Sequence, residues 1–129
     1  MQKSRENDIL RLTGIIKAIN GIKKCFKDYN IESFNDLKIE IIAQAACTQF
    51  ITNIYENKNK LLDETYVELP LLNNIKLAGA RHIASHDYDN VNFVIIYKIC
   101  NQLTQEAIFL EIEAIKTKIE RELINGPAD

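Results

Sequence analysis

The stretch from Ile9 to Phe26 reads ILRLTGIIKAINGIKKCF, and its apolar residues recur at steps of three and four. The apolar positions are Ile9, Leu12, Ile15, Ile16, Ile19, Ile22 and Phe26. This spacing places them on one face of a helix that begins near Ser4 to Asp8 and runs to about Asp28. Such a helix has to bury its apolar face against other elements, so the stretch favours a helical bundle.

A second helix is predicted to follow the turn at Tyr29-Asn30. Ser33 and Asp36 stand three residues apart before an apolar run, which is the pattern of a capping box. The expected helix runs from there to about Lys58. Its predicted buried face is Phe34, Leu37, Ile41, Ile42, Ala45, Ala46, Phe50, Ile51, Ile54 and Tyr55. The small residues Ala45 and Ala46 are candidates for a close contact with another helix, as are residues 78–80.

Two further long helices complete the predicted pattern, and residues 61–68 form a possible short one. The third main helix starts at Pro70-Leu71, because proline suits a first helical position, and continues to about His86. The fourth runs from Val91 to about Leu123, with a bend or break near residues 103–105, and Asn90 is a candidate cap. We therefore expect residues 1–129 to form a single all-α domain, an up-and-down bundle of four main helices.

Composition limits the possible functions. The net charge is -2, so no overall basic field attracts nucleic acid, and any contact with RNA has to be local. The three cysteines, Cys25, Cys47 and Cys100, lie in apolar periodic segments and are predicted to be reduced core residues in a cytoplasmic protein. The polar start of the chain predicts no signal peptide, and no stretch of ~18 apolar residues predicts a membrane span.

Candidate functional residues concentrate between Arg81 and Tyr88. Both histidines of the chain, His82 and His86, lie in this segment. An arginine is a permanent planar cation that fits phosphate oxygens, and a histidine exchanges protons near neutral pH. With an RNA phosphodiester, His86 would transfer protons and Arg81 would stabilise the charge of the transition state. The nucleophile would be the 2′-hydroxyl of the RNA, so the chemistry requires neither a metal nor a cofactor.

The spacing of Arg81 and His86 does not determine how their side chains are arranged relative to each other. Arg81 and His86 are five residues apart, which on an ideal helix is ~140° of rotation, so they do not share a face. They can converge if the helix ends near His86, if Arg81 reaches along a groove, or if a second copy contributes. The alternatives are a structural role for both residues, or a metal held by His82 and His86. A catalytic zinc needs a third protein ligand, which only Asp87 or Asp89 would supply.

The order Arg81, His82, three residues, His86, one residue and Tyr88 resembles the signature of the HEPN superfamily. More narrowly, it is similar to the HepT-like ribonuclease toxins, in which Arg, four residues, His, one residue and Tyr follow one another. The resemblance covers about residues 4–120, although its specific part is the segment from Arg81 to Tyr88. Many relatives carry Pro-Trp before the motif helix, whereas this chain has Pro70-Leu71.

The resemblance implies an all-α homodimer in which two motifs face one cleft and cleave RNA, with no role for DNA or a membrane. It implies that Arg81 and His86 are catalytic and that His82 supports the active site. It also implies a toxin–antitoxin pair of the HepT/MntA type, in which a minimal nucleotidyltransferase antitoxin adenylylates (AMPylates) Tyr88. The alternative is a non-catalytic helical partner that presents substrate to such a nucleotidyltransferase. A third interpretation is an unrelated structural bundle.

Overall fold

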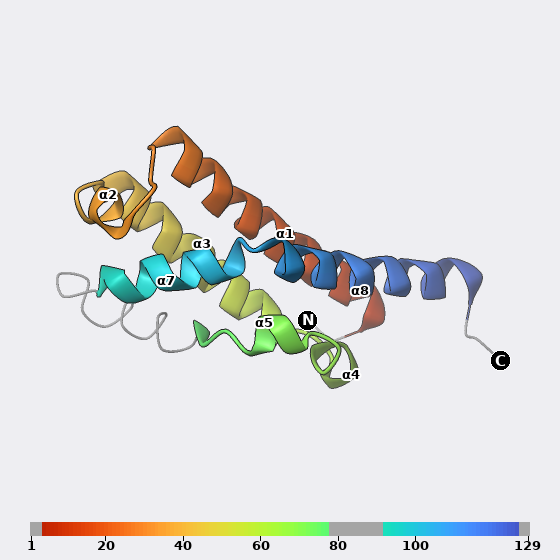
Figure 1. The fold of residues 1–129 in the computed structure, drawn as a ribbon. Coiled ribbons are helices and arrows are strands. Elements are labelled where there is room, and N and C mark those ends of the chain that lie inside the picture. The colour runs from red at the N-terminus through yellow and green to blue at the C-terminus, as the bar shows by residue number, and fades with distance from the viewer. Residues whose placement is uncertain (1–3, 78–91, 127–129) are drawn as a thin grey trace.

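The computed structural model describes residues 4–77 and 92–126, and every regular element in these ranges is a helix (Figure 1). In chain order these helices are α1 (Arg5–Asp28), α2 (Phe34–Lys38), α3 (Ile41–Asn59), α4 (Asp63–Tyr66), α5 (Pro70–Asn73), α7 (Phe93–Leu103) and α8 (Glu106–Asn125). The prediction of an all-α fold is confirmed. Four of these helices are long, namely α1, α3, α7 and α8, and the other three are single turns or little more.

Helix α1 is the centre of the bundle and matches its prediction. It begins after Ser4, whose hydroxyl accepts a hydrogen bond from the backbone N–H of Asn7 at 3.1 Å. This cap satisfies one of the N–H groups that a helix start leaves unpaired. The predicted apolar face packs on the core, with Leu12, Ile15, Ile19 and Ile22 fully buried and Ile9, Ile16 and Phe26 half-buried at its edges.

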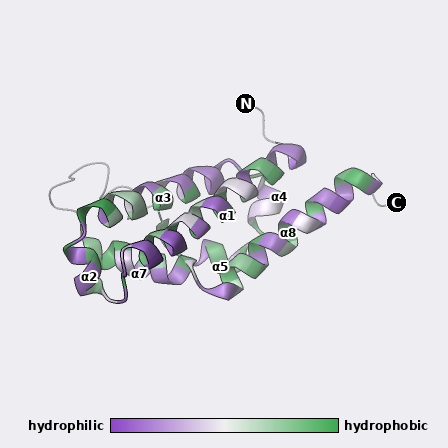
Figure 2. Ribbon diagram, turned by 90° about the horizontal axis from the view of Figure 1, so that it is seen from above, coloured by the Kyte–Doolittle hydropathy of each residue, from purple (hydrophilic) through white to green (hydrophobic). Residues whose placement is uncertain are grey.

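The long helices pack around α1. Helix α3 runs beside it and α8 covers another side, while α7 contacts α2 and α3 (Figure 1). Helices α7 and α8 follow one another almost end to end, so α7 covers one end of the bundle and α8 the other. Apolar side chains from all four long helices meet in one core, and hydrophilic residues lie on the outer faces (Figure 2). In the part of the chain that the structure describes, no helix is long and apolar enough to cross a membrane.

The prediction of one continuous second helix is wrong. The structure has two helices there, α2 and α3, with a break at residues 39–40. Its start is confirmed, since the Asp36 carboxylate accepts the backbone N–H groups of Glu32 and Ser33 at 2.9 and 3.1 Å. At the break, the Gln44 side-chain amide donates to the carbonyls of Leu37 and Lys38, both at 2.8 Å. These bonds satisfy the carbonyls that end α2 and let the chain start α3 in a new direction.

The break also changes which residues are buried. Ile41 and Ile42, predicted to be in the core, are 72% and 61% exposed. Ala45 is exposed as well, whereas Ala43 and Cys47 are fully buried. A helix that restarts after an interruption has a new rotational phase, so a periodicity continued across residues 39–40 assigns the wrong face. Beyond this point the prediction holds, and Ile51 and Ile54 are buried.

The predicted third helix is also interrupted. Helix α5 ends at Asn73, and residues 74–76 form a turn. The Glu111 carboxylate of α8 accepts the backbone N–H groups of Leu71 and Leu72 at 2.9 and 3.0 Å. This contact fixes a single helical turn after Pro70. The rest of the predicted helix, residues 78–86, lies outside the described residues, and so does the close contact predicted for residues 78–80.

The remaining boundaries agree with the sequence. The break predicted near residues 103–105 separates α7 from α8, and Gly126 ends α8 with a φ of 74°. The short helix predicted within residues 61–68 is α4. The side chain of Asn92 caps α7 by accepting the Val94 N–H at 3.1 Å, whereas the predicted cap, Asn90, is outside the described residues.

Two glycines of α1, Gly14 and Gly21, are in tight contact with side chains of α3. A Cβ atom at Gly21 would lie 2.5 Å from two ring carbons of Phe50. A Cβ atom at Gly14 would lie 2.9 Å from the amide nitrogen of Asn57, which is the end of a flexible side chain. The two glycines are therefore in contact with neighbours of very different stiffness.

Alanine at these two positions is expected to have opposite effects on stability. Gly21→Ala should lower the free energy of unfolding by about 1–2 kcal/mol, because the half-buried Phe50 ring has to move out of its packed position. Gly14→Ala should be neutral or stabilising by up to ~1 kcal/mol, because alanine is the better helix former and Asn57 can rotate away. Urea unfolding of both variants measures the difference. Equal effects of the two substitutions would contradict the packing described.

Candidate functional site

The predicted catalytic segment lies outside the described residues. Arg81, His82, His86 and Tyr88 all fall within residues 78–91. Their distances from one another, and the helix end expected near His86, therefore stay predictions. The structure does describe both flanks of this segment, which are residues 74–77 and the start of α7.

Both flanks are anchored in the core. Ile75 and Leu77, just before the segment, are 5% and 1% exposed. After the segment, Asn92 caps α7, whose inner face is Ile96, Ile99, Cys100 and Leu103. The described residues on the two sides of the segment therefore belong to the same apolar core.

A polar pocket lies between these two flanks. It has a volume of about 330 Å³ and is lined by Asn74, Lys76, Ile95, Lys98, Ile99 and Gln102. Lys76 and Lys98 are exposed and contribute two cations, while Asn74 and Gln102 contribute amide donors. Ammonium groups bind phosphate as point charges, and amides donate to its remaining oxygens. The pocket is thus suited to an anion of the size of a phosphate group.

Sequence reasoning did not find this pocket. Lys76 and Lys98 are separated by 21 intervening residues, and Lys76 lies in the turn after α5 whereas Lys98 lies in α7, so no motif connects them. Two lysines of α1 have different surroundings. Lys24 pairs with Asp28 at 2.8 Å, and the Lys23 ammonium lies 5.4 Å from the centre of the Phe109 ring.

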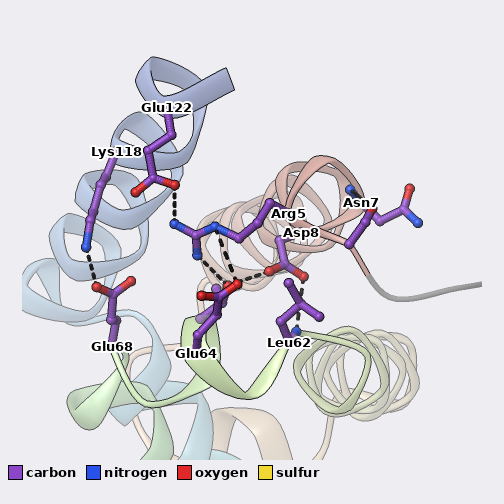
Figure 3. A network of polar contacts seen from close by, with 10 residues as sticks. Arg5, Asn7, Asp8, Leu62, Glu64, Glu68, Lys118 and Glu122 are labelled. Carbon is purple, nitrogen blue, oxygen red and sulfur yellow. Dashed lines mark hydrogen bonds and ion pairs between the residues drawn. The ribbon is translucent and has the colours of Figure 1, made fainter. Parts of the chain in front are cut away.

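A second polar cluster joins α1, α4 and α8 (Figure 3). Asp8 is fully buried, and its carboxylate accepts the hydroxyl of Thr65 and the backbone N–H of Leu62. Arg5 donates to the Thr65 oxygen at 2.8 Å and also pairs with Glu122 of α8. Because these donors and acceptors satisfy one another, the cluster connects three helices and is suited to a structural role.

The three cysteines form one buried contact chain. They are free, as predicted, and they come from α1, α3 and α7. The Cys47 thiol interacts with both the Cys25 and the Cys100 thiol in the buried core. Burial raises the pKa of Cys25 to about 12, and the contact with Cys100 together with burial raises the pKa of Cys47. The reactive thiolate forms of Cys25 and Cys47 are suppressed at neutral pH, which makes these two cysteines poor nucleophiles.

Thiol reactivity provides a direct check of this cluster. A thiol with a pKa near 12 is ionised to about one part in 10⁴ at pH 8, whereas an unfolded cysteine is ionised to about a quarter. Native protein should therefore react with a disulfide reagent at pH 8 at least ~100-fold more slowly than protein in guanidinium. Absorbance of the released thiol measures both rates. Rapid labelling of any cysteine in the native state would contradict the burial described.

Metal binding was an alternative for the predicted segment, and it involves both histidines, which lie outside the described residues. Within residues 4–77 and 92–126, no three histidine, cysteine, aspartate or glutamate side chains are grouped to hold a metal ion. The resemblance to the HepT-like toxins rests on the order of residues from Arg81 to Tyr88. Comparisons with protein-family models, with curated proteins and with solved structures find no match to this chain.

Proposed function

We propose that this chain is a metal-independent endoribonuclease toxin that acts in the cytoplasm as a homodimer. The observation that carries the proposal is the order Arg81, His82, His86 and Tyr88, in a helical chain that contains no other histidine. The pocket formed by Lys76 and Lys98 supports it, because its cations lie on the two flanks of that segment. A strand of RNA crossing these flanks would meet a phosphate site beside the catalytic segment.

The proposed reaction is an internal transesterification. His86 removes the proton of the 2′-hydroxyl, whose oxygen attacks the adjacent phosphorus while the 5′-oxygen leaves. The partner's His86 gives a proton to the leaving oxygen, so the products are a 2′,3′-cyclic phosphate and a 5′-hydroxyl. Arg81 holds the phosphate oxygens and stabilises the extra negative charge of the five-coordinate transition state. His82 adds a polar group beside this site.

Regulation is proposed to act on Tyr88. A minimal nucleotidyltransferase partner would transfer adenylate from ATP to the phenol oxygen, with release of pyrophosphate. The added nucleotide brings bulk and negative charge to the site, and negative charge repels an RNA phosphate. The mass of protein co-expressed with such a partner tests this step, since an added adenylate on Tyr88 is absent from a Tyr88→Phe variant.

The test of the function is cleavage of total cellular RNA by purified protein in EDTA, with growth of the expressing cells measured in parallel. A ribonuclease toxin fragments the RNA in EDTA and arrests growth when expressed without its antitoxin. Intact RNA and normal growth would reject the toxin and favour the alternative, a non-catalytic helical partner of a nucleotidyltransferase. The mild net charge of -2 suits that alternative, because it provides no general attraction for RNA.

A further inference from the structure

The polar pocket beside α7 has more binding groups than a phosphate needs. Part of its described lining is one face of α7, and the rest is the turn after α5 (Figure 1). The α7 residues are Ile95, Lys98, Ile99 and Gln102, and the turn contributes Asn74 and Lys76. Two ammonium groups are enough to bind a phosphate, which leaves an apolar wall and two amides without a ligand. The pocket is therefore suited to a larger molecule that carries a phosphate group.

The polar side chains of this pocket are unpaired in the part of the chain that the structure describes. The two ammonium groups form no ion pair there, and the two side-chain amides form no hydrogen bond. Gln102 is half-buried, so its amide is partly shielded from water without a protein partner in exchange. An amide presents one donor and one acceptor side by side. A ligand whose edge carries an acceptor beside a donor would satisfy both.

The apolar wall and the size of the pocket indicate the shape of the ligand. Ile95 is half-buried and Ile99 is 4% exposed, and they lie one helical turn apart. From Ile95 to Gln102 this face is ~10 Å long at the rise of an α-helix. The volume of about 330 Å³ lies at the lower end of the ~300–1,000 Å³ that is typical of small-molecule sites. A flat ring can cover the two isoleucines while its edge meets the amide of Gln102.

We propose that this pocket holds one adenine nucleotide. The base lies against Ile95 and Ile99 and pairs with the Gln102 amide, and the phosphate lies between Lys76 and Lys98. Adenine fits best, because its N6 amino group donates and its N7 accepts, which is the complement of a side-chain amide. Guanine presents two acceptors on the same edge and leaves the amide oxygen unpaired. Uracil and cytosine have a single ring and cover less of the apolar wall.

The nucleotide can come from either of two sources that share this chemistry, an RNA chain or a free adenine nucleotide. In RNA, the case that rests on the proposed function, a base held here would place the cleaved bond at a fixed distance from an adenosine. Sequence-specific recognition of RNA commonly reads unpaired bases by their edges in this way. Binding of the nucleotide needs no cleavage, so the pocket and the ribonuclease reaction can be tested separately.

The test is binding of fluorescent 2′-O-methyl tetranucleotides, which lack the attacking hydroxyl and stay intact. Fluorescence anisotropy gives the dissociation constant of the wild-type protein for each of four uniform sequences. The adenine tetranucleotide is expected to bind at least ~5-fold more tightly than the uracil one. Competition with 5′-AMP then identifies the source. Displacement by AMP at a similar concentration assigns the pocket to a free nucleotide, and displacement only at a far higher concentration assigns it to RNA.

Three variants separate recognition of the base from binding of the phosphate. Gln102→Leu keeps the size of the side chain and removes its amide, so the adenine and uracil dissociation constants should agree within ~2-fold. Asn101→Leu removes an exposed amide of the same helix, outside the described lining of the pocket, and should keep the preference for adenine. Lys98→Ala should weaken all four tetranucleotides by a similar factor, because they share the phosphate.

Equal affinity of the wild-type protein for all four tetranucleotides would overturn the inference, and so would an adenine preference that survives Gln102→Leu. Equal affinities that all fall in Lys98→Ala would show a phosphate site without a base site, which overturns the inference and leaves the proposed function standing. An adenine preference in a protein that does not cleave RNA in EDTA would support the nucleotide site and reject the ribonuclease.

Discussion

His86→Ala is expected to lower the rate of RNA cleavage by about 10²–10⁴-fold, the range of general acid–base catalysis. In the proposed reaction each of two His86 side chains transfers one proton, so alanine removes both the base and the acid. Arg81→Ala should lower the rate by about 10²–10³-fold, because it removes charge stabilisation that exists mainly in the transition state. Both losses should appear in kcat, with helix content by circular dichroism unchanged.

The lysines of the pocket between the flanks provide a contrast with these two residues. Lys76→Ala and Lys98→Ala should raise KM for RNA and leave kcat within a few-fold of wild type, since their role is to bind an adjacent phosphate. Lys24→Ala, on α1 and paired with Asp28, is the matched control and should change neither constant. Full activity in His86→Ala or Arg81→Ala would reject the proposed site.

Asp8→Ala is expected to lower the free energy of unfolding by about 2–4 kcal/mol. The substitution leaves the Thr65 hydroxyl and the Leu62 N–H without their acceptor in a place that water does not reach, and such groups are costly to bury unpaired. It also removes the link between the first turn of α1 and α4. For a domain of this size the midpoint of thermal unfolding should fall by roughly 8–15 °C.

The matched control for Asp8 is Asp28 at the other end of α1. Its carboxylate is 47% exposed and pairs with Lys24. Exposed ion pairs contribute little, so Asp28→Ala should change stability by less than ~0.5 kcal/mol. Urea unfolding with an unchanged m-value measures both variants. If Asp8→Ala and Asp28→Ala lower the free energy of unfolding by the same amount, the buried cluster does not stabilise the bundle.

Helix α1 could be predicted completely because all its signals are local. Its apolar residues repeat without interruption, and Ser4 is adjacent to the turn that it caps. The break between α2 and α3 is different. The stretch from Ile39 to Ile42 contains no glycine or proline, and the bonds from Gln44 that accommodate the break reach back six and seven residues. An apolar pattern read straight across this break therefore assigned Ile41 and Ile42 to the wrong face.

Contacts between residues far apart in the chain could not be predicted from the sequence. Asp8 resembles an ordinary residue of a first helical turn, and only Thr65, far along the chain, explains its burial. Helix α5 is held by Glu111, and the cysteine cluster needs three helices to meet. The same holds for the candidate site, where residue types could be predicted but contacts between elements could not. Arg81, His86 and Tyr88 stand out by residue type and order, whereas the Lys76 and Lys98 pocket depends on how α7 packs beside residues 74–76.

The most direct test of the proposed ribonuclease is the chemistry of its products. Purified protein is incubated in EDTA with total cellular RNA and with single-stranded DNA, and the new ends are identified. Wild-type protein is expected to cleave the RNA to 2′,3′-cyclic phosphate and 5′-hydroxyl ends and to leave the DNA intact. The R81A/H86A variant is expected to cleave neither. Equal cleavage by that variant, cleavage of DNA, or ends that carry a 5′-phosphate would contradict the proposed reaction.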